Sequence, residues 1–317
     1  MPIRVLDMFC GAGGSSAGAY SAGAKIVRGI DAWELATRTF QDNFTGALVE
    51  TRELGPYSGP TSDMREGEID LLLASPECTN HSPAKGSKPR SEASRRTSHY
   101  VRNFARRLKP RWIVLENVVQ LRGWRGYAPL ISDLHNLGYR IRPQILDAVE
   151  FGVPQTRRRL FVLCDRDQEP APVKPRKRKR RNAADAIQLH GSWPSRPLYL
   201  DGRAHATLER AERAIDALGK RVPFLIVYYG SDGSGGWQPL NRPLRTLTTL
   251  DRFGLVTWDG REPMLRMLQV DELRRAMGFP SKYRFDRGTR RDRIMMLGNG
   301  VAPPVMKAIV ESLARSG

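Results

Sequence analysis

A lone cysteine, Cys78, stands where a short apolar run ends and a polar loop begins. The apolar run, residues 71–74, is typical of an interior strand of a parallel sheet, and Pro76 and Glu77 follow it. Ligands of such sheets bind at the carboxyl ends of the strands, so Cys78 is placed as a nucleophile would be. Free cysteine is also a common inert core residue, and the segment alone leaves both interpretations open.

Other polar groups follow other predicted strands. Glu116 and Asn117 come directly after the apolar residues 112–115, and we expect them at the same sheet edge as Cys78. A partly buried Glu116 would have a raised pKa and could donate a hydrogen bond to a ring nitrogen, whereas its commoner role would be to cap a helix.

Two arginines begin a later predicted strand. The alternation of residues 155–160 directs Arg157 and Arg159 to one face. Either they recognise phosphate or base oxygens there, or that face is exposed to solvent.

A glycine-rich turn lies between the first predicted strand, residues 3–8, and a helix of small residues. Gly11, Gly13 and Gly14 would let backbone N–H groups approach a ligand, and Asp31, at the end of the second strand, could accept hydrogen bonds from a ribose. This pattern suggests a nucleoside site. No Lys-Ser/Thr pair of the phosphate-binding type follows, which disfavours phosphoryl transfer.

Strands and helices alternate through the first half of the chain. This pattern predicts an α/β fold with a doubly wound, mostly parallel, Rossmann-like sheet. The expected strands are residues 3–8, 26–30, 69–74, 112–115, 141–146 and 160–163.

The alternation stops after Cys164. Residues 174–181 form a block with seven basic residues, which we expect on the surface along phosphates. The remaining elements expected are helices at 35–44, 203–219, 270–277 and 303–313 and a strand at 224–229. We therefore predict a catalytic domain over 1–165, a smaller domain over 166–285, and a C-terminal segment, 286–317, that returns to the first domain.

Composition narrows the class of partner. The 317 residues carry a formal net charge of +19, which favours nucleic acid as the partner. Three widely spaced cysteines argue against a disulfide framework and for a reducing compartment, and Cys78, His81 and His99 do not complete a metal site. We expect no membrane span and no signal peptide, and hence an intracellular protein.

Six segments together resemble, in order and spacing, the signature blocks of the DNA (cytosine-5)-methyltransferase family, and the resemblance covers nearly the whole chain. The six segments are 7–14 (DMFCGAGG), 76–78 (PEC), 116–118 (ENV), 155–159 (QTRRR), 242–249 (RPLRTLTT) and 298–305 (GNGVAPPV).

The resemblance implies a chemistry and a set of residue roles. The family transfers a methyl group from S-adenosylmethionine to carbon 5 of cytosine in double-stranded DNA, after a thiolate adds to carbon 6 of a flipped-out base. By position, Cys78 is the nucleophile, Glu116 holds or protonates N3, Arg159 binds the carbonyl oxygen at position 2, and Arg157 helps to order the site. The cofactor-binding positions implied are Phe9, Gly11, Ala12, Gly13, Gly14, Asp31, Ala32, Asn299 and Val301.

Four features of the sequence affect these assignments. The recognition region between Cys164 and Val222 is short and dominated by the basic block, so it offers phosphate affinity rather than visible base readout. Glu77 stands where the family has a proline, and it would raise the thiol pKa only if it pointed inward. Ala32 is small for a residue that stacks on adenine, and Trp33 is the alternative. The pair that reads the adenine amino group has no clear counterpart in residues 50–54. Phe9, on periodicity alone, would be a core residue.

Two alternative functions remain alongside the one that the resemblance implies. An RNA methyltransferase is the nearest rival, since a basic surface attracts both polymers, and a non-catalytic nucleic-acid-binding relative is the next. A bacterial or phage-infected cytoplasm and a cognate restriction endonuclease are expected. Residues 82–97, rich in Gly, Ser, Lys and Arg, suit a loop that closes over the base.

Overall fold

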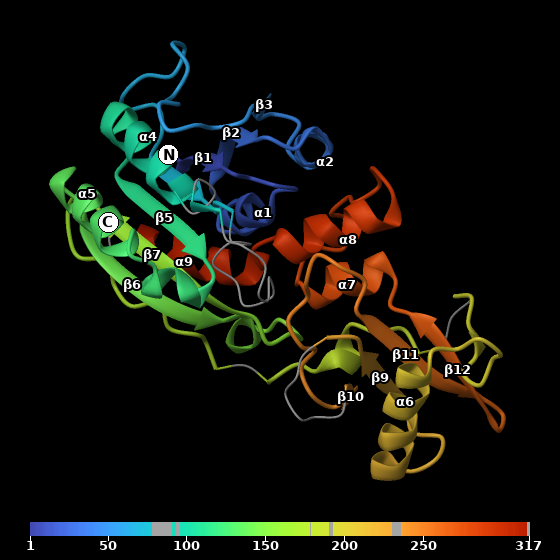
Figure 1. The fold of residues 1–317 in the computed structure, drawn as a ribbon. Coiled ribbons are helices and arrows are strands. Elements are labelled where there is room, and N and C mark those ends of the chain that lie inside the picture. Colours follow the sequence, from blue (N-terminus) through green and yellow to red (C-terminus); the bar gives the residue numbers. More distant parts are fainter. Residues whose placement is uncertain (78–90, 93–95, 178, 190–192, 230–235, 316–317) are drawn as a thin grey trace.

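The computed structural model describes residues 1–317 except for 78–90, 93–95, 178, 190–192, 230–235 and 316–317. Its larger part is built on a seven-stranded sheet with the order β3-β2-β1-β4-β5-β7-β6 (Figure 1). The first five strands in this order are parallel, and β7 is antiparallel to both of its neighbours. The strands are β1 (Arg4–Met8), β2 (Lys25–Asp31), β3 (Leu48–Thr51), β4 (Leu71–Ala74), β5 (Trp112–Asn117), β6 (Arg140–Asp147) and β7 (Arg158–Asp165).

Helices cover both faces of this sheet, and the alternation along each strand decides which side chain meets which helix. Leu71 and Leu73 of β4 share a core with α1 (Gly14–Ser21), α2 (Glu34–Asn43) and α9 (Pro303–Arg315). Leu72, between them, faces the opposite way and packs with α4 (Val101–Leu108) and α5 (Tyr127–Asn136). The sheet is therefore doubly wound and buried on both faces, which explains the apolar runs and confirms the predicted fold class.

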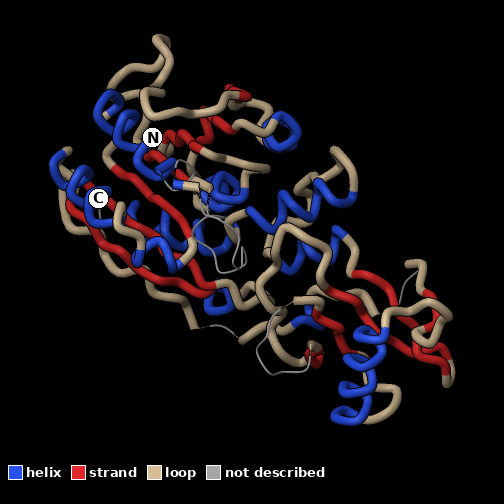
Figure 2. The backbone as a smooth tube through the Cα atoms, in the orientation of Figure 1, coloured by secondary structure: helices blue, strands red, loops and turns tan. Residues whose placement is uncertain are grey.

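The smaller part is an antiparallel sheet with the order β10-β9-β11-β12-β8, covered on one face by α6 (His205–Leu218), as Figure 2 shows. Ala211 and Ala214 of α6 pack against Phe224, Ile226 and Val256. The strands are β8 (Arg196–Pro197), β9 (Phe224–Val227), β10 (Trp237–Pro239), β11 (Phe253–Asp259) and β12 (Glu262–Met267).

The chain returns from the small sheet through α7 (Val270–Ala276) and α8 (Arg290–Asn299). Their buried side chains share one apolar core with the α1–α9 face of the large sheet and with the other face of the small sheet, so the two parts are joined by a continuous core. The domain limits 1–165, 166–285 and 286–317 stay predictions. Within the described residues, the chain also forms short 3-10 helices at Arg96–Tyr100, Val119–Gly123, Ala148–Phe151 and Ala183–Asp185.

The basic block 174–181 links the two parts. Just before it, Val173 exchanges two hydrogen bonds with the side chain of Gln144 in β6, and just after it the N–H of Ala183 donates to the carbonyl of Arg242. All of its basic residues that the structure describes are exposed. No helix in the described ranges combines the length and apolarity needed to cross a bilayer.

Candidate active site

A cavity of about 320 Å³ opens at the carboxyl ends of β1, β2, β4 and β5, beside the first residues of β7. It collects most of the residues that the sequence singled out, from segments as far apart as the first strand and α8. The lining includes eight of the nine proposed cofactor positions, Phe9, Gly11, Ala12, Gly14, Asp31, Ala32, Asn299 and Val301, and three of the four proposed catalytic residues, Glu116, Arg157 and Arg159.

The predicted nucleophile, Cys78, lies outside the described residues, as does most of the proposed closing loop, 82–97. The two residues just before Cys78, Pro76 and Glu77, do line the cavity. The amide of Asn117 donates to the carbonyl of Pro76 over 3.1 Å, so the end of β5 holds the chain that leads to Cys78. Glu77 is exposed.

The glycine-rich turn has an unusual backbone. Phe9, Gly11 and Gly13 all have positive φ, at 56°, 52° and 89°. Glycine adopts this region without cost, but for Phe9 it is strained, and such strain persists only where the surrounding structure imposes it. Phe9 is partly buried and both lines the cavity and packs against the core, so the interpretation of Phe9 as a core residue describes only part of its environment.

Asp31 ties the turn to the second strand. Its carboxylate accepts the N–H of Gly11 over 2.8 Å through Oδ2 and the N–H of Trp33 over 2.9 Å through Oδ1. Burial raises the pKa of Asp31, and these backbone N–H groups oppose that shift. Ala32 and Trp33 both line the cavity, as do Glu53 and Leu54 in the segment for which the sequence allowed no assignment.

Gly13 is the exception among the proposed cofactor positions, since it is not part of the cavity lining. It faces the other way, and a Cβ there would overlap the hydroxyl of Tyr283 and the ring of Phe44. Gly13 therefore makes room for packing beneath the turn.

Glu116 and Arg159 form an ion pair across β5 and β7. Arg159 Nε lies 3.2 Å from Glu116 Oε1, and the Glu116 side chain is only 8% exposed. Burial raises the pKa of Glu116, while the guanidinium groups of Arg159 and Arg157 offset part of that shift. The protonated form of the carboxyl is therefore favoured more at this wall of the cavity than it would be in water.

Arg157 is also buried, at 3% exposure, but its side chain is used differently. Its Nη1 donates to the carbonyl of Leu247 over 3.0 Å, and its Nη2 donates to those of Gly298 and Gly300 over 2.8 and 2.9 Å. The solvent-exposed alternative is therefore wrong for both arginines. Arg157 connects β7 to two segments that come much later in the chain.

Gln155 repeats this connection. Its Nε2 donates to the carbonyl of Ala276 over 3.2 Å, and its Oε1 accepts the N–H of Leu247 over 2.8 Å. No separate role was predicted for this glutamine. Only its membership of the 155–159 block could have drawn attention to it.

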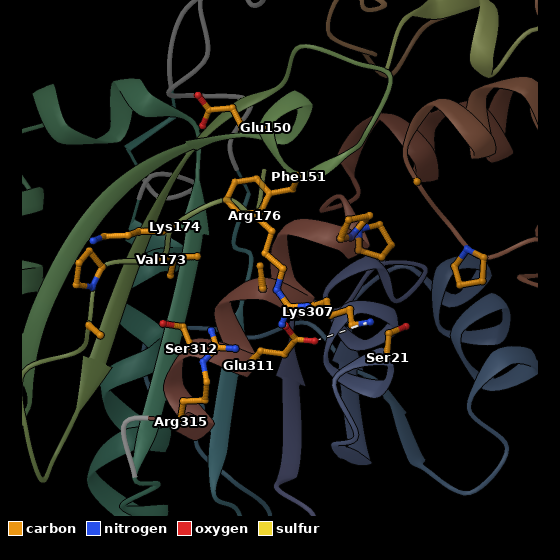
Figure 3. A pocket seen from close by; sticks show the side chains of 17 residues that line it. Ser21, Glu150, Phe151, Val173, Lys174, Arg176, Lys307, Glu311, Ser312 and Arg315 are labelled. Carbon is orange, nitrogen blue, oxygen red and sulfur yellow. Dashed lines mark hydrogen bonds and ion pairs between the residues drawn. The ribbon is translucent and has the colours of Figure 1, made fainter. Parts of the chain in front are cut away.

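A larger cavity, about 600 Å³, lies on the face of the large sheet that carries α1 and α9 (Figure 3). Arg176 and Lys307 approach the carboxylate of Glu311 in it, at 3.2 and 3.8 Å, so its charges are partly compensated. It holds none of the proposed catalytic or cofactor residues. Among the residues that the structure describes, no cluster of His, Cys, Asp and Glu could hold a metal ion.

Comparison with known proteins gives one consistent result. The sequence model of the C-5 cytosine-specific DNA methylase family matches residues 3–315. The chain is 24% identical to the Type II methyltransferase M.HindV of Haemophilus influenzae, over 98% of this chain and 96% of the relative. It is 32% identical to M.HgiDI of Herpetosiphon aurantiacus over 167 residues, which span about half of each chain.

Solved structures agree with the fold. Schizosaccharomyces pombe Dnmt2 superposes with a TM-score of 0.68 at 18% identity, over 100% of this chain and 99% of that one. A protein encoded in an E. coli prophage gives 0.69 at 19% identity, over 99% of both chains. With the family match extending over almost every residue, the chain belongs to the C-5 cytosine-specific DNA methylase family and is a DNA cytosine-5 methyltransferase.

Proposed function

We propose that the protein transfers a methyl group from S-adenosylmethionine to carbon 5 of a cytosine flipped out of double-stranded DNA, through a transient bond between Cys78 and carbon 6. The observation that carries this proposal is the buried Glu116–Arg159 pair beside a cavity lined by the glycine-rich turn. A buried acid and a fixed guanidinium on one wall match the ring nitrogen and carbonyl oxygen of a cytosine edge.

The residues of the cavity fit the proposed cofactor. Its volume, about 320 Å³, lies within the range of small-molecule sites. The Asp31 carboxylate keeps acceptor capacity for ribose hydroxyls after accepting two backbone N–H groups, while Trp33 and Leu54 supply apolar walls for an adenine ring. When bound, S-adenosylmethionine supplies a methyl group on a positively charged sulfur.

The protein's own groups would act on the base. The Cys78 thiolate adds to carbon 6, and the electron pair of the 5,6 double bond becomes available at carbon 5. Glu116 stabilises the electron density that reaches N3 by donating its proton there, and Arg159 binds the oxygen at position 2. When carbon 5 takes the methyl group, the bonding electron pair stays on the cofactor's sulfur, which becomes a neutral thioether, and N3 returns its proton to Glu116. A base then removes the carbon 5 proton, the electron pair restores the 5,6 double bond, and the bond to Cys78 breaks to regenerate the thiolate.

The polymer is assigned from charge and from relatives. A net charge of +19 and a basic block at 174–181, whose described basic residues are exposed, favour a polyanion. M.HindV is named a Type II methyltransferase, which supports DNA as the substrate, a cognate restriction endonuclease as a partner, and a bacterial or phage-infected cytoplasm as the location.

The test uses purified protein, S-adenosylmethionine labelled in its methyl group, and matched duplex DNA and structured RNA. We expect label on cytosine carbon 5 of the DNA and a denaturation-resistant complex with DNA that carries 5-fluorocytosine, because the fluorine cannot leave as a proton does. Cys78→Ala should abolish both signals while DNA binding persists. If only the RNA were labelled, the substrate would be RNA and the assignment of DNA would be wrong. If Cys78→Ala were as active as wild type, Cys78 would not be the nucleophile.

A further inference from the structure

We infer that Tyr283 is a positioning residue for the cofactor-binding turn, although it lies about 270 residues away in the sequence. Its hydroxyl donates to the carbonyl of Ala12 over 2.5 Å. Ala12 lines the cavity, but Tyr283 does not, so the tyrosine would act through the backbone of the turn. The inference rests on the cofactor site proposed above.

The hydrogen bond fixes one particular peptide unit. A peptide is planar, so the direction of the Ala12 carbonyl sets the direction of the next N–H, that of Gly13. That N–H donates to the carbonyl of Cys10 over 2.8 Å. The peptide between Ala12 and Gly13 is thus held at both ends. The residues on either side of Gly13, Ala12 and Gly14, both line the cavity.

The turn needs such support, because its backbone is not one that the chain adopts by itself. Phe9 occupies the left-handed region, and Gly11 and Gly13, also at positive φ, could leave it freely. The Tyr283 hydroxyl lies against Gly13, where a Cβ would overlap it. The contact therefore supports the underside of the turn at Gly13, where no side chain restricts the backbone.

Tyr283 is itself well anchored. Its ring packs against Phe279 and Phe285, with centroids 4.8 and 5.4 Å away. The side chain of Asn43, at the end of α2, bonds both backbone groups of the next residue, Arg284, at 2.8 and 3.0 Å. Burial also raises the pKa of Tyr283 well above its usual value, so the hydroxyl keeps its proton and remains a donor.

The experiment compares two hydroxyl deletions. Tyr139 offers a matched control, because its hydroxyl also donates to a backbone carbonyl, that of Pro110, over 2.7 Å, but just before β6, at the opposite edge of the sheet. Binding of S-adenosylmethionine is measured by calorimetry for wild type, Tyr283→Phe and Tyr139→Phe. Steady-state kinetics then separate KM for the cofactor from kcat.

We expect Tyr283→Phe to raise the Kd and KM for S-adenosylmethionine by about tenfold, with kcat changed less than about twofold. Tyr139→Phe should lower the melting temperature about as much as Tyr283→Phe does, but it should leave the Kd for S-adenosylmethionine unchanged. If Tyr283→Phe does not fold, Asn43→Ala serves instead, because it releases the segment that carries Tyr283 from α2. This variant should also raise the Kd for S-adenosylmethionine.

Unchanged cofactor affinity in a folded Tyr283→Phe protein, or equal loss in both tyrosine variants, would overturn the positioning role alone. Failure of the wild-type protein to bind S-adenosylmethionine would overturn the cofactor assignment itself, and this inference with it.

Discussion

Three consecutive arginines allow a sharp test of how the block at 155–159 is used. Arg157 donates three hydrogen bonds to the carbonyls of Leu247, Gly298 and Gly300 from a buried position. Arg157→Met keeps an aliphatic stem of similar length but leaves the three carbonyls without this donor. Hydrogen bonds to a charged group contribute about 1.5–3 kcal/mol each, and they share one guanidinium, so we expect a loss of about 3–6 kcal/mol in unfolding free energy.

Arg159→Met should cost much less stability. The residue pairs with Glu116, whose pKa burial already raises, so the carboxyl can take up a proton when its partner is removed. We expect a loss of about 1–2 kcal/mol at pH 7, together with near-complete loss of methyl transfer. Arg158→Met is the control, since Arg158 is exposed and should change stability by less than about 0.5 kcal/mol.

Urea unfolding followed by tryptophan fluorescence and by circular dichroism measures all three variants, and methyl transfer is measured on the folded ones. The expected order of destabilisation is Arg157→Met, then Arg159→Met, then Arg158→Met. If Arg157→Met unfolded at the same urea concentration as Arg158→Met, the three carbonyl contacts would not hold the segments together, and the division between a structural and a catalytic arginine would be wrong.

Two further predictions concern buried carboxyl groups. Glu116→Gln keeps the shape of the side chain but cannot donate its proton in the same way, so kcat should fall about 10²- to 10⁴-fold. Wild-type activity should fall as the pH rises through the raised pKa of Glu116, and this fall should be absent from the pH–activity profile of the variant. If the variant lost activity at the same alkaline pH as wild type, another group would be responsible for that loss. Burial raises the pKa of Asp7 from 3.8 to about 7, so the folded state holds this proton more tightly than the unfolded chain and loses stability as pH rises across that interval. The Asp7→Asn side chain cannot titrate. Between pH 4 and pH 8, its unfolding free energy in urea should therefore rise relative to that of wild type, by at most about 4 kcal/mol. If the unfolding free energies of the two proteins changed with pH in parallel, the raised pKa of Asp7 would be contradicted.

The central strands of the large sheet could be predicted because they are buried on both faces. Residues 71–74 and 112–115 are uninterrupted apolar runs, and the structure confirms strands there. The edge strand β3 has no fully buried residue, and its weak apolar pattern gave no signal. Helix α8 was not predicted, because the many charged residues at its start obscure its apolar pattern. The sequence does contain a capping box, formed by Thr289 and Asp292, that marks the start of this helix.

The site could be predicted as a set of residues but not as a set of contacts. Periodicity placed Arg157 and Arg159 on one face, yet their partners differ, because those of Arg157 lie 90 to 143 positions away. Gly13 is a similar case, since glycine in a turn suits both close approach to a ligand and close packing. The position of Tyr283 beneath it shows that packing by itself already requires glycine there.

The order of the chain has a mechanical consequence. The small sheet is inserted between β7, which carries Arg159, and α8, which ends at Asn299. Arg159 at the start of β7 and Asn299 at the end of α8 line the same cavity, and Arg157 joins the two segments through the carbonyls of Gly298 and Gly300. The cavity is therefore complete only after the chain has returned from the small sheet. Leu247, which lies between β10 and β11 of the small sheet, also accepts a hydrogen bond from Arg157, so the small sheet is tied directly to the residue that joins these two segments.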